Sequence, residues 1–168
     1  GDFVTTADID LNHLVFTPAA NANGSGYATF TFQVRDDGGT ANGGLDLDPT
    51  ANSISIDVTA VNGAPAGTDK RVTVDEDASY TFTAPDFGFA DADGDAFLAV
   101  EVTTLSAAGA LTSNGVPVSA GDVITTADID VGRVLFTPAA NASGASYARF
   151  TFQVRDDGGT VNGGGDLD

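Results

Sequence analysis

The chain has 168 residues and a formal net charge of −18, and its acidic residues are 22 Asp and only 2 Glu. This charge repels phosphate backbones and anionic lipid surfaces, so it argues against nucleic acid and membrane insertion and favours divalent cations as partners. The sequence contains no Cys, which excludes disulfides, thiolate metal sites and thiol nucleophiles. Because Asp favours turns whereas Glu suits helix interiors, the composition predicts an all-β protein with very little helix.

The first 48 residues return almost unchanged as the last 48, with 35 identities at an offset of 120 residues. This period is too long for a solenoid repeat of roughly 20 to 50 residues, and it suits an independently folding domain of about 100 to 150 residues. We therefore interpret the chain as a segment of a tandem array of acidic modules.

Alternating apolar and polar residues predict strands along the whole chain. In the first copy the predicted strands are residues 27–34 and 53–61, with Ile54, Ile56 and Val58 on one face of the second strand. About seven short strands in each module suit a Greek-key β-sandwich. In the second copy the same alternation predicts strands at residues 71–74, 80–83, 97–105, 110–112, 116–119, 133–137 and 147–154.

A linker is predicted at residues 61–67, VNGAPAG, where Pro65 and two glycines interrupt the strand pattern. We expect residues 1–61 to be the C-terminal half of one module, residues 62–67 the linker, and residues 68–168 the next module without its last strand. Alternating strand directions then place residues 91–95 and residues 155–159 beside the linker. The same alternation places the turn that contains Glu76 at the far end of the module.

The acidic loop at residues 91–95, DADGD, favours calcium, which binds 6 to 8 hard oxygen ligands. It is not an EF-hand, since its Gly is fourth rather than sixth and Val102 stands where the twelfth-position Glu is needed. The alternative is a solvated acidic turn. Asp156 and Asp157 likewise either bind calcium or form an ordinary Asp-Gly turn. The same choice stays open for Asp46, Asp48, Asp166 and Asp168.

Several motifs together resemble the cadherin-like tandem repeats of large bacterial surface adhesins of the RTX type, which are exported by type I secretion. The resemblance covers the whole chain. It implies cadherin/immunoglobulin-like β-sandwich modules, calcium at the module boundaries, and an extracellular role at the cell surface in biofilm or surface attachment. The matching segments are VNGAP (61–65), VDEDAS (74–79), DADGD (91–95), VLFTPAANASG (134–144) with its counterpart at 14–24, and FTFQVRDDGG (30–39 and 150–159).

The resemblance also implies the ligands of a boundary calcium site. Glu76 would serve the next boundary along the array. Gly63 stands where the linker of such repeats usually has Asp, and this removes one carboxylate from the site. The implied ligands are Asp91, Asp93, Asp156 and the carbonyl of Asn62, with Asp95 and Asp157 as second choices.

Three functions follow from these features. The first is a calcium-stiffened extender or adhesion segment whose partners are neighbouring modules. The second is a module that binds polysaccharide or glycan, although only Tyr27, Tyr80 and Tyr147 offer candidate platforms in a chain without Trp. The third is a self-assembling fibre subunit, because a module without its last strand has an open sheet edge that another copy could complement.

Catalysis is not expected from this sequence. Residues 64–168 contain no His, so a Ser-His-Asp triad cannot be built there. The paired carboxylates lie in loops that calcium explains better. No apolar run approaches the roughly 18 residues of a membrane span.

Overall fold

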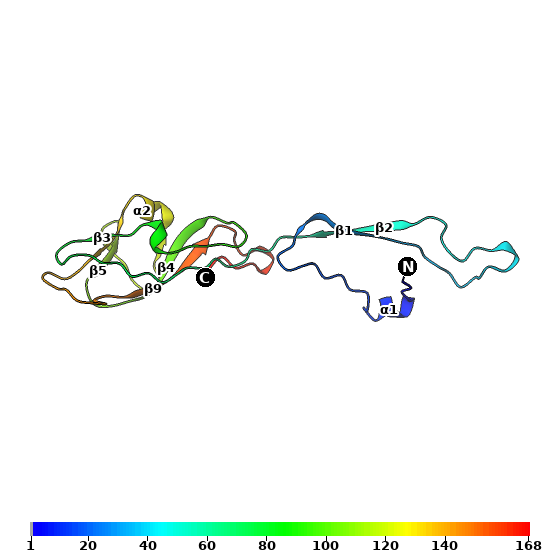
Figure 1. The fold of residues 1–168 in the computed structure, drawn as a ribbon, viewed down its shortest axis with the longest axis horizontal. Helices are drawn as coiled ribbons and strands as arrows, with labels where there is room; N and C mark the ends of the chain where they lie inside the picture. The colour runs from blue at the N-terminus through cyan, green and yellow to red at the C-terminus, as the bar shows by residue number, and fades with distance from the viewer. Residues whose placement is uncertain (1) are drawn as a thin grey trace. The chain divides into compact units, whose positions relative to one another are not determined.

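The computed structural model describes residues 2–168, and its internal contacts divide the chain into unit 1, up to Ala60, and unit 2, Val61–Asp168. Unit 1 contains the helix α1 (Thr6–Asp10), the strand β1 (Gly24–Phe32), the one-turn 3₁₀ helix η1 (Ala41–Gly43) and the strand β2 (Asn52–Val58). The two strands lie side by side and antiparallel (Figure 1). Phe30 lies opposite Ile54.

The hairpin of unit 1 has an open apolar face. No residue between 2 and 60 is buried. Phe30 is 42% exposed and Ile54 is 44% exposed, although both lie on the face that the alternation predicts to point inward. The described residues of unit 1 thus form no packed core of the kind that stabilises unit 2. A single two-stranded sheet of this kind is only marginally stable in water.

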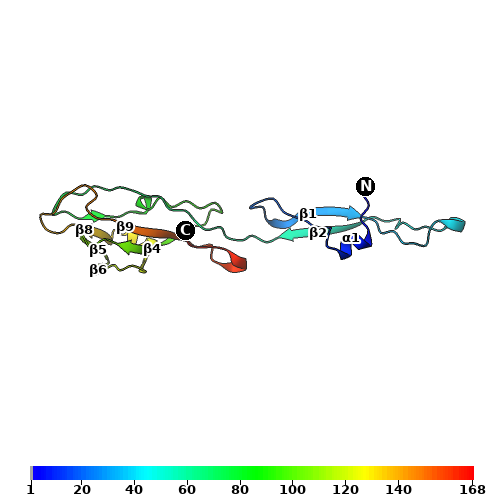
Figure 2. The same cartoon turned by 90° about the horizontal axis from the view of Figure 1, so that it is seen from below.

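Unit 2 is built from two antiparallel sheets (Figure 2). One sheet has the order β3 (Tyr80–Thr81), β8 (Val134–Thr137), β5 (Ala110–Ser113) and β6 (Val116–Pro117). The other has the order β7 (Val123–Thr125), β4 (Phe97–Leu105) and β9 (Phe150–Asp156). This arrangement confirms the predicted all-β sandwich class.

Side chains from both sheets form one hydrophobic core in unit 2. Val100 of β4 and Val154 of β9 are fully buried, and they share the core with Val134 of β8 and Leu111 of β5. Aromatic rings fill the remaining space, and the ring of Phe87 meets that of Phe152 edge-on at 5.2 Å. Burial of such side chains contributes about 1.5–3 kcal/mol each, and this supplies most of the stability of the unit.

Helix is scarce, as predicted, and the two α-helices of the described chain are short pieces with the same sequence, TADID. Both α1 and α2 (Thr126–Asp130) are five residues long and begin at a capping threonine. The hydroxyl of Thr125 accepts the backbone N–H of Asp128, as Thr5 does for Asp8. Two further 3₁₀ turns, η2 (Ala84–Asp86) and η3 (Val161–Gly163), complete the chain.

The predicted strand at residues 71–74 is wrong. Its sequence alternates correctly, and Val72 and Val74 are partly buried while Arg71 and Thr73 are exposed. However, no strand among residues 2–168 lies beside this segment to exchange backbone hydrogen bonds with it. The predicted strand at 147–154 is present only from Phe150 onward, as β9.

Candidate metal centre

The acidic loop at residues 91–95 is organised by its first carboxylate. Oδ1 of Asp91 accepts the backbone N–H groups of Asp93 and Asp95, both at 2.9 Å. Gly94 has φ +86°, a conformation that other residues rarely adopt. This turn brings one carboxylate oxygen from each of the three Asp residues within 4.8 Å of the others. Oδ2 of Asp91 is buried and has no hydrogen-bond partner among the described residues.

Asp156 is the buried carboxylate of the site. It is the last residue of β9, lies opposite Phe97 of β4, and is only 1% exposed. Its Oδ1 accepts the N–H of Gly158 at 2.9 Å and the amide of Asn62 at 3.0 Å. Its Oδ2 has no donor within the described part of the chain. An unpaired buried polar group costs about 1–3 kcal/mol, and more when it is charged, so this oxygen calls for a cationic partner.

Linker residues complete the cluster from a third direction. The side-chain amide of Asn62 also donates to the carbonyls of Gly159 (3.1 Å) and Gly165 (2.7 Å), which fixes the orientation of the amide. Its Oδ1 therefore points away from these acceptors, and it is buried without a partner in the described structure. The N–H of Gly63 donates to Oδ2 of Asp93 at 2.7 Å.

Gly158 lets these segments approach one another. A Cβ at this position would collide with Oδ1 of Asn62 and with Oδ2 of Asp95. Both oxygens therefore face the same small space beside the backbone of Gly158. RDDGG in the sequence is compatible with calcium binding or with an ordinary Asp-Gly turn, and it gives no sign of this close approach, which only the contacts between distant segments reveal.

Asp95 responds to the accumulated negative charge. Burial and the neighbouring carboxylates Asp91, Asp156, Asp157 and Asp93 together raise the pKa of Asp95 above its usual range. The neighbouring negative charges disfavour ionisation of Asp95, because like charges repel at short range. A bound divalent cation would convert the same repulsion into attraction.

Of the remaining predicted ligands, Asp157 joins the cluster and Glu76 does not. Oδ1 of Asp157 accepts the N–H of Ala96 at 2.7 Å, and the N–H of Asp157 donates to the carbonyl of Ala96 at 3.1 Å. These bonds fasten the loop at 91–95 to the end of β9. Glu76 is exposed and lies in a separate turn, closed by the bond from the Ala78 N–H to the Asp75 carbonyl.

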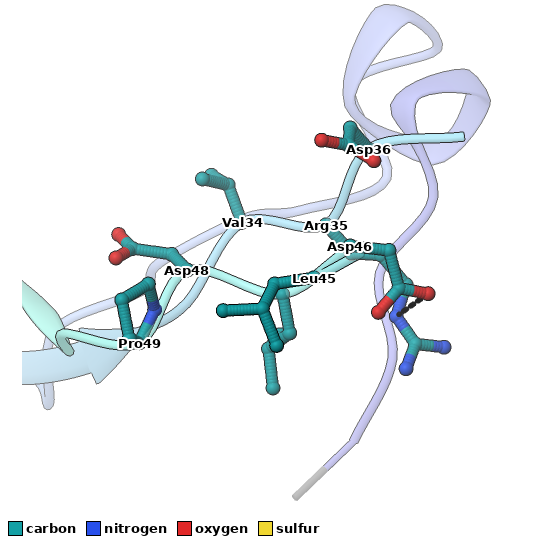
Figure 3. Close-up of a pocket in the computed structure, with 8 residues that line it drawn as sticks. Val34, Arg35, Asp36, Leu45, Asp46, Asp48 and Pro49 are labelled. Carbon is teal, nitrogen blue, oxygen red and sulfur yellow. Dashed lines mark ion pairs between the residues drawn. The ribbon is translucent and has the colours of Figure 1, made fainter. Parts of the chain in front are cut away.

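The first copy shows which part of the site forms locally. Gly38 donates to Oδ1 of Asp36 at 2.8 Å, as Gly158 does to Asp156. Asp36 is nevertheless exposed, and in the open pocket around it the carboxylate of Asp46 pairs with Arg35 at 3.4 Å (Figure 3). Residues 2–60 include no counterpart of residues 62–63 or 91–95, and among them the turn alone does not bury a carboxylate.

The loop carboxylates after β9 have other partners. Asp166 pairs with Arg155 at 3.3 Å, matching the pair between Arg35 and Asp46 in the first copy. Oδ2 of Asp168 accepts the N–H of Gly67 at 3.0 Å. In the first copy, Asp48 accepts the N–H of Thr50 at 2.9 Å. Each of these loop carboxylates therefore has a partner within the described part of the chain.

A second buried carboxylate provides a comparison inside the same unit. Asp86 is 6% exposed, and it accepts from Nζ of Lys70 at 2.7 Å, the N–H of Thr83 at 2.8 Å and the hydroxyl of Tyr80 at 3.1 Å. Burial acts to raise the pKa of Asp86, but the bonds from Lys70 and Thr83 outweigh it and hold the pKa below its usual range. Asp86 is thus satisfied by protein donors, whereas Asp156 is not.

The tyrosine side chains pack and form hydrogen bonds within the protein. The ring of Tyr147 meets Phe136 edge-on at 6.4 Å, and its hydroxyl accepts the N–H of Ala139 at 3.3 Å. Tyr27 makes the equivalent contacts in the first copy. Tyr80 packs on Phe82 with the ring centroids 5.0 Å apart. These contacts do not favour a sugar-stacking platform.

The sequence of unit 2 matches a known protein family. The profile of the bacterial Ig domain family matches residues 62–164, more than half of the chain. The chain therefore belongs to the bacterial Ig domain family, in agreement with the two-sheet fold of unit 2. No curated protein and no solved structure matches it.

Family membership confirms part of the predicted resemblance. It supports a bacterial Ig-like repeat, a class that is typically non-catalytic, typically extracellular and compatible with a surface adhesin module. The cadherin-like type, the export route and the role of calcium stay predictions. No helix among residues 2–168 is long and apolar enough to cross a membrane.

Proposed function

We propose that the chain is a calcium-stiffened extender segment of a large bacterial adhesin of the RTX type, at the cell surface or secreted, that serves biofilm or surface attachment. Membership of the bacterial Ig domain family supports the adhesin module. The observation that carries the calcium site is Oδ2 of Asp156, a buried carboxylate oxygen without a donor among the described residues.

The donor set suits calcium. The oxygens that lack partners, on Asn62, Asp91 and Asp156, come from three segments that converge beside Gly158. Asp93 and Asp95 add carboxylates to the same cluster. Calcium accepts such mixed carboxylate and amide ligands in flexible geometry, whereas magnesium demands a near-ideal octahedron and keeps most of its waters.

The mechanism is linkage between binding and local order. A cation that binds only the assembled cluster stabilises the arrangement of residues 62–63, the loop at 91–95 and the end of β9. Without the cation, the carboxylates repel one another and the hydrogen bonds of Asn62 and Gly63 act alone. Because residues 62–63 directly follow Val61, the first residue of unit 2, their ordering would restrict the chain at the start of the unit.

Calorimetric titration of the full chain with calcium, and separately with magnesium, tests the site. We expect calcium to bind more tightly than magnesium, and the double variant Asp91→Asn/Asp156→Asn to lose binding. The control Asp130→Asn changes an exposed aspartate outside the cluster and should bind as the parent chain does. No binding, or equal binding of both metals, would refute the calcium site.

A hydrodynamic measurement tests the stiffening separately. When a chelator removes calcium, we expect the hydrodynamic radius of the full chain to rise and its melting temperature to fall. If calcium binds but neither quantity changes, the site exists and the stiffening function is wrong.

A further inference from the structure

Five asparagines of the chain are followed directly by glycine. They are Asn23, Asn42, Asn62, Asn114 and Asn162. An Asn-Gly pair is especially prone to deamidation, because glycine has no side chain to shield its backbone nitrogen from the amide carbon of the preceding asparagine. The structure places these pairs in different surroundings, so we expect them to react at different rates.

Deamidation needs freedom of both groups that react. The glycine nitrogen attacks Cγ of the asparagine and loses its proton, while Nδ2 takes up a proton and leaves as ammonia. Water then opens the resulting cyclic imide at one of its two carbonyls, which gives aspartate or, mainly, isoaspartate. A pair whose amide and following N–H are both held in tertiary hydrogen bonds reacts only after a local opening breaks these bonds.

Asn42 represents the accessible pairs. Its side chain is exposed, in the turn η1, with φ +54°. Asn162 repeats this arrangement in η3, with φ +58° and an exposed side chain. Asn114 is partly held, because its Nδ2 donates one hydrogen bond to Oδ1 of Asp128 at 2.8 Å.

Asn62 differs from all of these, because both of its reacting groups are held. Its Nδ2 donates three hydrogen bonds of 2.7–3.1 Å, to Oδ1 of Asp156 and to the carbonyls of Gly159 and Gly165. Oδ1 of the same amide is buried. The attacking group, the N–H of Gly63, donates to Oδ2 of Asp93 at 2.7 Å. The amide and the nitrogen are thus fixed by two different segments of the chain.

The bonds that close this pair belong to the metal centre. The pair becomes reactive only when residues 62–63 separate from the loop at 91–95 and from the end of β9. Repulsion between the carboxylates favours that separation, whereas a cation bound to the assembled centre opposes it. The rate of deamidation at Asn62 therefore depends on how often the centre opens.

The product cannot rebuild the centre. Neither aspartate nor isoaspartate at position 62 has an Nδ2 to donate to Asp156, and each places a new negative charge beside that buried carboxylate. Isoaspartate also adds a methylene to the main chain, which displaces the carbonyl of residue 62 that accepts the N–H of Gly165 at 3.1 Å. Since ammonia has left, the change is permanent.

We propose that Asn62–Gly63 is a latent deamidation site, that the assembled metal centre holds it closed, and that its reaction after opening permanently disables the centre. Protection by the hydrogen bonds needs no metal. Additional protection by calcium rests on the proposed function.

Rates measured by peptide mass spectrometry test the protection. The full chain is incubated at mildly alkaline pH in chelator, in calcium and in denaturant, and the rate at each asparagine in denaturant normalises its rate in the folded chain. In chelator we expect Asn62 to react at least tenfold more slowly than Asn42. Calcium should slow Asn62 at least tenfold further and leave Asn42 unchanged.

The outcomes separate this proposal from the calcium site. Equal normalised rates at Asn62 and Asn42 in chelator would overturn the proposal. An unchanged rate at Asn62, in a chain to which calcorimetrically measured calcium binds, would overturn the protection by the metal and leave the calcium site standing. If calcium does not bind at all, the proposed function fails, while a tenfold slower reaction of Asn62 in chelator still supports the closed pair.

The effect on the centre is measured on the product. Anion exchange isolates chains deamidated at Asn62 and chains deamidated only at Asn42, which gain the same charge and serve as the matched control. We expect calcium to bind the first at least tenfold more weakly than the second. Equal affinities would refute the claim that the reaction disables the centre.

Discussion

Replacement of Asp156 by Asn separates the two roles of this buried carboxylate. The amide keeps an oxygen for the bonds from Gly158 and Asn62, and it removes one of the four negative charges that act on Asp95. Without metal, we expect Asp156→Asn to be more stable than the parent chain by about 1 kcal/mol, since an unpaired buried carboxylate oxygen costs about 1–3 kcal/mol. With calcium, the order of stability should reverse.

The reversal has a predictable size. For a site of extracellular strength, with Kd about 0.1 mM, calcium at 10 mM stabilises the folded state by about 2.7 kcal/mol. Loss of a ligand that weakens binding about 100-fold leaves about 0.4 kcal/mol. For a unit of this size the corresponding rises in Tm are roughly 10–20 °C for the parent chain and about 2–3 °C for the variant.

Differential scanning calorimetry in chelator and in 10 mM calcium measures both differences. Asp130→Asn, which removes a charge outside the cluster, controls for the change in net charge. The reasoning is refuted if Asp156→Asn gains as much from calcium as the parent chain does. It is also refuted if the variant is the less stable protein in chelator.

Three other substitutions probe the site and the core. Gly158→Ala should lose about 1–3 kcal/mol and weaken calcium binding, because its methyl group would displace Asn62 and Asp95; Gly165→Ala, which meets only ordinary contacts, is the matched control, and titration with denaturant measures both. Asp86→Ala should lower the free energy of unfolding by about 2–4 kcal/mol, since it leaves the donors around a buried ion pair without an acceptor. The pKa of Asp86 is lowered in the folded state. The contribution of Asp86 to the free energy of unfolding is therefore complete above pH about 4, and it is lost as the pH falls through the lowered pKa. Unfolding measured from pH 6 to pH 2 should show a smaller loss of stability for Asp86→Ala than for the parent chain. Val100→Ala should cost about 2 kcal/mol, whereas Val161→Ala, at a side chain that is 75% exposed, should leave the Tm unchanged.

Strand prediction succeeded where one face of a strand is buried against the other sheet. Residues 97–105 alternate in sequence and form β4 with the same bounds, because β7 and β9 pair with it on both sides. Residues 71–74 alternate equally well but remain unpaired. Alternation reports which face a segment buries, whereas a strand also requires a neighbour, and the neighbour is a property of the whole fold.

The short helices were missed for a different reason. A five-residue helix is too short to show a helical period, and its only sequence signal is the capping pair, Thr125 with Asp128. That pair occurs in both copies and could have been recognised. In contrast, nothing local marks Gly158 or the orientation of Asn62, because both depend on contacts between residues about 95 positions apart.

The bonds between Asn62 and Gly165 have a mechanical consequence. The N–H of Gly165 donates to the carbonyl of Asn62 at 3.1 Å, and Gly67 donates to Asp168, so both described ends of unit 2 are fastened at one place. Tension applied at Val61 and Asp168 would load these bonds one after another, and they would peel apart at low force.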